Sequence, residues 1–223
     1  MREQNRLIAL LAVAGFAGTA LAGNPTLILD DFDADPNDDA GGPRAVSTTI
    51  FGGSGSFGGT HRFDIVTDTI YAGDEGSAVF ESGVGINLSG TIRWDNDGAG
   101  LALDAAALGL VGFELDFAVI DQNFNIELRI EDGDGTTSIA TANTDALNLS
   151  GNSVRTDSYS LDLFDLTDFD MTNVAAIQIT FNTRSGVVDG LDFAATEFRA
   201  VVPTPGPLAL LALGGVVCTV RRR

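Results

Sequence analysis

The chain contains no lysine, and it has only one cysteine, one histidine and one tryptophan among its 223 residues. The cysteine, Cys218, stands near the C-terminal end, so the rest of the chain holds no second thiol with which to form a disulfide. The histidine, His61, is the only residue that a Ser-His-Asp triad could use, and no Gly-x-Ser-x-Gly turn accompanies it. Stability must therefore come from a buried core, and triad chemistry is not indicated.

Positive charge is also scarce. The formal net charge is −19, from 31 acidic residues against 12 arginines, and five of those arginines lie in the two terminal segments. Such a surface repels phosphate backbones and anionic lipid, so the composition argues against binding to nucleic acid or to an acidic membrane surface. Divalent cations are its natural counter-ions, and solubility in salty or calcium-rich surroundings is the simplest explanation of the charge.

The N-terminal segment has the pattern of a secretion signal. Arg2 and Arg6 precede the apolar run 7–17, and Ala20-Leu21-Ala22 supplies the small-x-small sequence that signal peptidase recognises. We therefore predict a signal peptide over residues 1–22, cleavage before Gly23 and export of the mature chain.

The C-terminal segment, 202–223, joins a proline-rich stretch to the apolar run 208–220 and a terminal arginine cluster. This order resembles the PEP-CTERM sorting signal of bacterial exosortase substrates, with Thr204 where the family has glutamate. The resemblance implies processing by an exosortase-type enzyme near Pro205 and delivery to the cell surface or extracellular matrix. The residues that carry it are Pro203, Thr204, Pro205, Gly206, Arg221, Arg222 and Arg223.

The apolar run of this tail is short for a membrane span. Thirteen helical residues rise about 20 Å, whereas the hydrocarbon core of a bilayer is about 30 Å thick. A short C-terminal apolar helix would therefore suit a transient contact with the inner membrane, its arginines remaining cytoplasmic. A permanent C-terminal anchor is the alternative.

Between the two signals, over residues 23–201, the hydrophobic period is two. Val111, Phe113, Leu115, Phe117 and Val119 alternate with polar or small residues, as half-buried strands do. The same alternation recurs at 126–130, 159–163 and 177–181, and further strands are expected at 26–32, 45–51, 77–81, 90–95 and 192–201.

Turn signals such as Asp97-Gly98 and Asp189-Gly190 separate these segments, and the alanine-rich stretch 101–110 is long enough only for one helical turn or an irregular crossing. The pattern predicts an all-β domain, a two-sheet antiparallel β-sandwich of the jelly-roll type.

The steps Asp30-Asp31-Phe32 and Asp192-Phe193 resemble those of galactose-binding-like jelly rolls. That resemblance implies neighbouring first and last strands, glycan binding and a structural calcium ion.

Acidic side chains alternate in the loop after the first predicted strand, an arrangement of oxygen ligands that suits calcium. Pro36 and Gly42 replace the glycine and glutamate of an EF-hand, so a calcium loop of another type and a solvated acidic loop are the two interpretations. The candidate ligands are Asp31, Asp33, Asp35, Asn37 and Asp39. A second acidic sequence, Asp132-Gly133-Asp134-Gly135, is more typical of a hairpin turn.

The sequence Gly53-Ser54-Gly55-Ser56-Phe57-Gly58 matches the spacing of a dinucleotide-binding loop. Such a loop needs a helix N-terminus after it to receive the pyrophosphate, and the residues that follow here are strand-forming. We therefore interpret the match as a glycine-rich loop.

Aromatic platforms for sugar rings are few, since Trp94, Tyr71 and Tyr159 are the only aromatic residues other than phenylalanine. Trp94 stands beside Asp95 and Asp97 at a predicted strand end, and these three residues form the candidate glycan site.

Taken together, these patterns predict a non-enzymatic surface or extracellular-matrix protein with a structural or adhesive role and weak glycan contact. Its expected partners are the processing enzyme and an extracellular polysaccharide, with no cofactor other than calcium. A small secreted hydrolase acting on polysaccharide is the alternative, because paired carboxylates can cleave glycosidic bonds.

Overall fold

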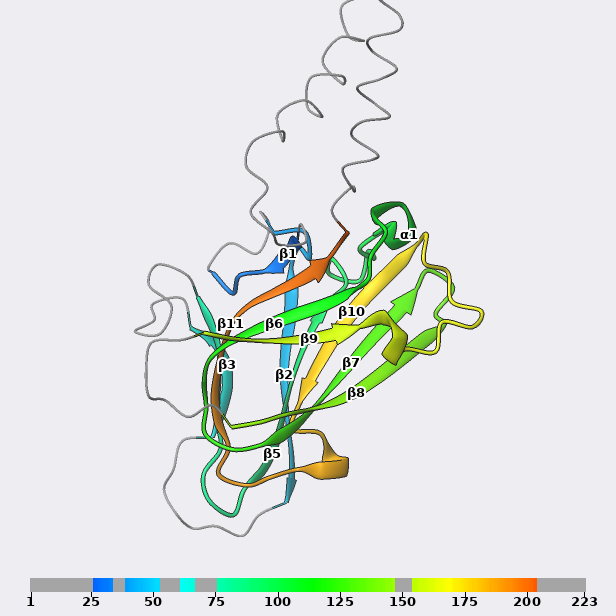
Figure 1. Ribbon diagram of the computed structural model, residues 1–223. Coiled ribbons are helices and arrows are strands. Elements are labelled where there is room, and N and C mark those ends of the chain that lie inside the picture. Colours follow the sequence, from blue (N-terminus) through cyan, green and yellow to red (C-terminus); the bar gives the residue numbers. More distant parts are fainter. Residues whose placement is uncertain (1–25, 34–38, 53–60, 67–75, 147–153, 204–223) are drawn as a thin grey trace, which may run out of the picture. The chain divides into compact units, whose positions relative to one another are not determined.

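The computed structural model describes residues 26–33, 39–52, 61–66, 76–146 and 154–203. They form two antiparallel sheets packed face to face, which confirms the predicted jelly-roll β-sandwich (Figure 1). The six-stranded sheet contains β1 (Thr26–Asp30), β3 (Arg62–Val66), β4 (Ser77–Glu81), β6 (Gly112–Ile120), β9 (Arg155–Ser160) and β11 (Asp192–Val201). The five-stranded sheet contains β2 (Arg44–Gly52), β5 (Asn87–Trp94), β7 (Phe124–Asp132), β8 (Thr137–Thr144) and β10 (Val174–Phe181).

The strand order explains how the ends of the domain meet. The six-stranded sheet runs β3-β4-β11-β6-β9, with β1 also paired to β11, and the five-stranded sheet runs β2-β5-β10-β7-β8. In the β1–β11 pair Leu27 lies opposite Ala200, so the first and last strands are neighbours, as the jelly-roll resemblance implied. In the first sheet β3, β9 and β1 each pair with one strand only, and the edge strands of the second sheet are β2 and β8.

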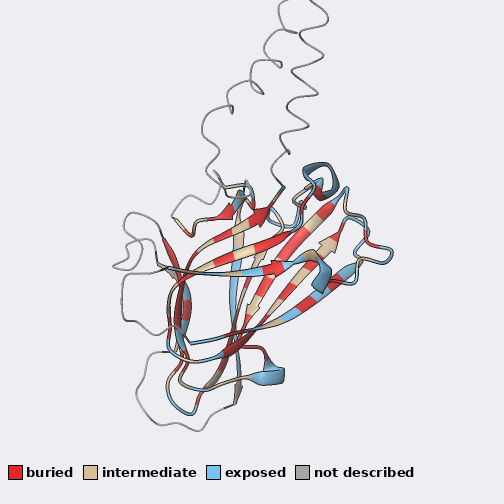
Figure 2. Ribbon diagram, in the orientation of Figure 1, coloured by how far each residue is buried: buried red, intermediate tan, exposed pale blue. Residues whose placement is uncertain are grey.

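The core lies between the two sheets and is rich in phenylalanine. Alternate residues of β6 and β7 point inward and are buried, whereas their neighbours are partly exposed (Figure 2). Phe193 lies at the centre, with its ring centroid 4.9 Å from that of Phe181 and 5.0 Å from those of Phe80 and Phe124. Burial of each such side chain stabilises the fold by about 1.5–3 kcal/mol, which is how a domain without disulfides can be stable.

Several boundaries differ from the sequence prediction. The first strand ends at Asp30 rather than Phe32, because Phe32 has a positive φ of 59° and its N–H binds the Asp30 carboxylate. The strand predicted at 159–163 ends at Ser160, since Leu161–Leu163 form the 3₁₀ turn η1, capped by the Ser160 hydroxyl. Strand β3 begins in the stretch after the glycine-rich segment that the sequence indicated as strand-forming, whereas strand β8 was not predicted. Ile139 is the only large aliphatic residue of β8, so its alternation is weak.

The alanine-rich stretch contains a single helical turn, α1 (Ala105–Leu108), as the sequence indicated. Asp104 caps its first turn by accepting a hydrogen bond from the Ala107 N–H, and Gly109 ends it with a left-handed φ of 65°. A further 3₁₀ turn, η2 (Arg184–Gly186), follows β10.

The predicted signal peptide and the sorting tail from Thr204 onward lie outside the described residues, and Pro203 is the last residue described. Among the residues that are described, no helix has both the length and the apolar character to cross a membrane.

Candidate functional site

The proposed role of Trp94 as a sugar-facing ring is wrong. Its side chain is 1% exposed, its ring stacks on Phe198 at a centroid distance of 5.0 Å, and its indole N–H donates to the Asp30 carboxylate at 2.7 Å. The reason is positional, because Trp94 continues the inward alternation of Ile92 along β5. A ring enclosed in this way offers no face to a ligand.

The two acids grouped with Trp94 belong to a turn at the surface. Asp95 accepts a hydrogen bond from the Arg93 guanidinium at 2.8 Å and another from the Gly98 N–H at 3.0 Å. The Arg93 hydrogen bond is the main reason that the pKa of Asp95 is below its usual value. Asp97 lies in the same turn with a positive φ of 54°. Asp95 therefore stabilises a surface turn in which Asp97 is exposed, and neither acid forms a site with the buried indole.

The structure brings together only part of the predicted calcium loop. Carboxylate oxygens of Asp30, Asp31 and Asp39 all lie within 4.8 Å of one another. Asp30 was not among the predicted ligands, and Asp35 and Asn37 lie outside the described residues. Asp39 also accepts the Asp31 N–H at 3.2 Å, which fixes the two ends of the loop together.

An internal cation already neutralises the buried member of this cluster. Asp30 is completely buried, and the Arg44 guanidinium lies 2.6 Å from its Oδ1 atom while Trp94 binds its Oδ2 atom. Arg44 also donates to the Asp33 carbonyl oxygen. Because burial is the largest effect, the pKa of Asp30 is raised despite Arg44. Calcium prefers six to eight oxygen ligands, so the described residues supply only a partial set.

The outer face of the five-stranded sheet is a different kind of surface. A single row of outward-facing residues crosses all five strands, from Thr141 through Glu127, Thr180 and Thr91 to Ser47. Each is partly or fully exposed, and each offers hydroxyl or carboxylate oxygens. This five-residue row, which we call the polar row, lies opposite the face that forms the core.

Neighbouring side chains extend the polar row on one side. Gln178 lies next to Thr180 and donates to its hydroxyl at 3.3 Å, and Thr91 donates to the same oxygen at 3.3 Å. Arg129 and Arg93 are the cross-strand partners of Gln178. Together with the polar row, these residues therefore present hydroxyl, amide, carboxylate and guanidinium groups side by side.

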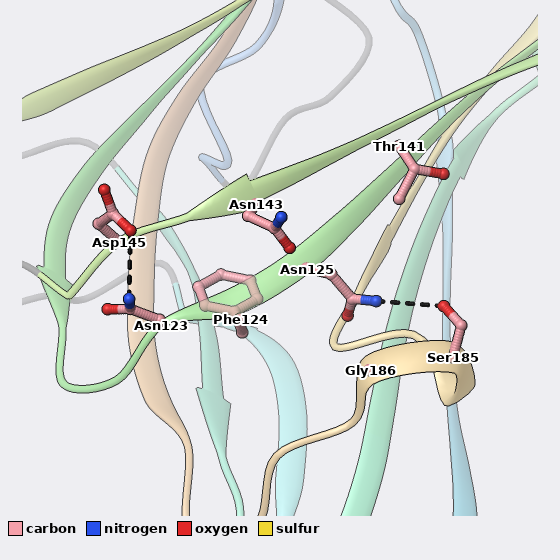
Figure 3. A pocket seen from close by; sticks show the side chains of 8 residues that line it. All are labelled: Asn123, Phe124, Asn125, Thr141, Asn143, Asp145, Ser185 and Gly186. Atoms are coloured by element: carbon pink, nitrogen blue, oxygen red, sulfur yellow. Dashed lines mark hydrogen bonds between the residues drawn. The ribbon is translucent and has the colours of Figure 1, made fainter.

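One end of the polar row opens into a pocket of about 520 Å³ between β7, β8 and η2 (Figure 3). Six of its eight lining residues are polar, and three of these are asparagines. The lining residues are Asn123, Phe124, Asn125, Thr141, Asn143, Asp145, Ser185 and Gly186. Thr141 belongs to both the pocket and the polar row, so the two surfaces are continuous.

Hydrogen bonds hold two sides of this pocket in place. Asn125 binds Thr183 through both ends of its amide and Ser185 at 3.3 Å, which ties η2 to β7. On the other side Asn123 donates to Asp145 at 3.2 Å. Thr141 and Asn143 are exposed on β8 and line the pocket (Figure 3). Sequence reasoning overlooked this site because asparagines are common in loops and give no distinctive spacing.

Two further sequence candidates have structural roles. The His61 ring accepts a hydrogen bond from the Gly83 N–H at 3.1 Å. Asp132 begins the turn between β7 and β8, accepting the N–H groups of Asp134, Thr136 and Asp170, and these hydrogen bonds lower its pKa. The predicted hairpin is therefore confirmed. The glycine-rich segment 53–58 lies outside the described residues, and the next described element is strand β3.

No protein-family model matches the chain, and no curated protein matches its sequence. The backbone is similar to a family 11 carbohydrate-binding module from Clostridium thermocellum, in complex with a β-1,3-1,4-mixed-linked tetrasaccharide. That match has 10% identity and a TM-score of 0.46, and it covers 82% of this chain and 98% of the module. An exo-β-agarase matches with 10% identity and a TM-score of 0.47, over 82% of this chain and 26% of the agarase. The likeness lies in the fold alone.

Proposed function

We propose that this chain is an exported, non-enzymatic surface or extracellular-matrix protein whose β-sandwich makes weak contacts with polysaccharide. The observation that carries the proposal is the polar row across the five-stranded sheet, continuous with the asparagine-rich pocket at its end. A sugar chain presents hydroxyl groups at regular intervals, and a row of hydroxyl, amide and carboxylate groups can donate to or accept from several of them at once.

The physical character of the row sets the expected strength. Each neutral hydrogen bond contributes only about 0.5–1.5 kcal/mol net, because water competes for the same groups. Among the described residues of the row and pocket the one aromatic residue is Phe124, and it is buried. We therefore expect weak binding at a single site, which a matrix protein can make effective through many simultaneous contacts.

Export and sorting are the second part of the proposal and rest on the terminal sequences. Signal-peptide cleavage would release the mature chain outside the inner membrane. The tail would then hold it there transiently until an exosortase-type enzyme cleaves near Pro205. A calcium ion at the loop of Asp31 and Asp39 is a further part of the proposal, supported by the approach of their carboxylates.

Hydrolysis of the polysaccharide is the function we set aside. A glycosidase of the usual kind needs one carboxyl group of raised pKa and a second carboxylate beside it. Asp145 is the one carboxylate that lines the pocket, and it accepts a hydrogen bond from Asn123. Glu127, the carboxylate of the polar row, stands on the middle of β7.

The binding proposal can be tested by electrophoresis of the β-sandwich through gels that contain soluble polysaccharides. The variant Thr141→Ala/Asn143→Ala should lose most of the retardation that the unmodified domain shows, because both residues are exposed at the pocket and away from the core. Ser158→Ala, on β9 of the other sheet, is the matched control and should keep it. If the double variant were slowed as much as the unmodified domain by every polysaccharide that slows the unmodified domain, the proposal would be contradicted.

A further inference from the structure

Strand β2 is the exposed edge of the five-stranded sheet. It is hydrogen-bonded to β5 along Arg44–Gly52, and within the described part of the chain no strand pairs with its other edge. That edge presents a row of backbone N–H and C=O groups, which can pair with another extended chain. The strand is nine residues long and rich in β-branched residues, so it is well suited to such pairing.

Charge normally protects such edges, and β2 has almost none. In the other sheet the edge strand β3 carries Arg62 and Asp64, and β9 carries Arg155 and Asp157. The third strand that has a single partner, β1, is five residues long and ends at the buried Asp30. In contrast, the 24 residues from Ala40 to Phe63 contain no acidic residue at all, in a chain of net charge −19. The single charge within β2, that of Arg44, is neutralised by Asp30. A second copy approaching this edge therefore meets no like charge on the strand itself.

The edge also exposes apolar side chains on the side that faces the core. Val46 is 37% exposed and Ile50 is 63% exposed, although their partners Ile92 and Leu88 on β5 are buried. The Phe63 ring of β3 packs against Gly90 of β5, so the covering sheet reaches β5 there while Val46 and Ile50 of β2 remain exposed. The other edge strand, β8, differs, because its inward-facing Ala140 is already buried.

The sequence of β2 is complementary to itself when two copies run antiparallel. If a two-fold axis passes at Thr48, Val46 of one copy lies opposite Ile50 of the other on the inner side. In the same register Ser47 lies opposite Thr49 on the outer side. Directly opposed residues of an antiparallel pair have Cβ atoms about 4.5–5.5 Å apart, so the apolar pair would be in contact and so would the hydroxyl pair. We propose that β2 pairs with β2 of a second copy and forms a symmetric dimer.

The dimer has a consequence for the surface described above. A two-fold axis perpendicular to the sheets joins the two five-stranded sheets into one sheet of ten strands, with both polar rows on the same side. Ser47, at the end of each row, stands on the joining strand. The dimer thus doubles the length of the polar surface. Pairing along one strand buries less area than a standard interface, so the dimer should be weak and dependent on concentration.

The test uses the full chain with Cys218 replaced by Ser, so that each variant carries one thiol. Under mild oxidation Thr48→Cys should give a disulfide-linked dimer, because the axis places the two thiols opposite each other. Thr141→Cys, at the middle of the other edge strand β8, is the matched control and should remain at least ten-fold less cross-linked. A mixture of Val46→Cys and Ile50→Cys chains should cross-link to each other more than either does to itself.

A second variant separates edge pairing from association through the apolar ends of the chain. Adding Ser47→Lys and Thr49→Lys places like charges opposite each other in the dimer, and it should reduce cross-linking of Thr48→Cys at least ten-fold with unchanged circular dichroism. Equal cross-linking at Thr48 and Thr141 would overturn the proposal. Hydrogen exchange showing β2 edge amides protected in the monomer would also overturn it, since another segment of the chain would then cover the edge. Polysaccharide binding by the monomer is a separate measurement.

Discussion

At the scale of single residues, the most consequential arrangement is the buried Asp30 with its two partners. Arg44 and Trp94 bind the two oxygens of one carboxylate that has no exposure to water. The tryptophan therefore anchors the first strand to the end of β5 in the other sheet. An ion pair of this kind is worth little in total, but the loss of one partner leaves the other charge buried and uncompensated.

We predict that Arg44→Gln destabilises the domain by about 3–5 kcal/mol at pH 7, because Asp30 then remains buried without a counter-ion. The folded-state pKa of Asp30 is already raised by burial and would rise further. A carboxyl group whose pKa is raised in the folded state destabilises the fold at pH values above that pKa, where the group must be charged. The stability lost by Arg44→Gln should therefore become smaller as the pH falls through the folded-state pKa of Asp30. Urea denaturation at pH 7 and pH 5 measures this.

The exposed pair of Arg62 and Glu81 supplies the control, since Arg62→Gln should cost less than about 1 kcal/mol. The double variant Asp30→Asn/Arg44→Gln should recover part of the loss. If Arg44→Gln lost the same stability at both pH values, the charge of the buried Asp30 could not be the cause of the loss.

At the scale of elements, the close packing of β3 on β5 depends on a glycine. A Cβ atom at Gly90 would lie 2.5 Å from the Phe63 ring, a distance that real contacts do not reach. We predict that Gly90→Ala destabilises the domain by about 1–3 kcal/mol. In a Phe63→Ala background the same change should cost much less, as a double-mutant cycle with thermal or urea unfolding would show. Equal costs in both backgrounds would mean that the ring can move aside.

The acidic loop after β1 is the second element with a measurable response. If calcium binds there, millimolar Ca²⁺ should raise the Tm more than NaCl of equal ionic strength, because screening alone relieves repulsion in both salts. Binding at one hundred times Kd stabilises by about 2.7 kcal/mol. Asp31→Asn/Asp39→Asn should remove the difference between the salts. Equal shifts in calcium and sodium for the unmodified domain would leave a solvated acidic surface as the interpretation.

At the scale of the whole molecule, the chain divides between a folded body and its terminal segments. The last strand ends at Val201, and its hydrogen bonds are made to β1, β4 and β6. We predict that a chain without residues 204–223 keeps its β-sheet circular dichroism and its cooperative melting.

We also predict that mass spectrometry of the exported protein finds Gly23 as its first residue. Retention of the apolar run 7–17 would contradict the export prediction, and loss of cooperative melting would contradict the division.

Much of the fold could be predicted because alternation is a local property. The inward residues of β6, such as Phe113 and Leu115, and the turn at Asp132 follow from neighbours in the sequence. The candidate site could not be predicted in the same way. Thr141, Glu127 and Thr180 lie on strands far apart in the sequence, and only the pairing of β8, β7 and β10 aligns them.

The sequence by itself determined most of the strand-forming segments, the acidic charge, the absence of disulfides in the body and the terminal patterns on which the export prediction rests, since each depends on residue type and spacing. Tertiary structure alone decided the rest. Trp94 is a core residue because its strand register directs it inward onto Asp30 and Phe198. The polar row and the open edge of β2 exist because sheet order brings distant strands together and leaves one side of β2 without a partner strand within the described domain. Such order arises from long-range pairing, which no local pattern encodes.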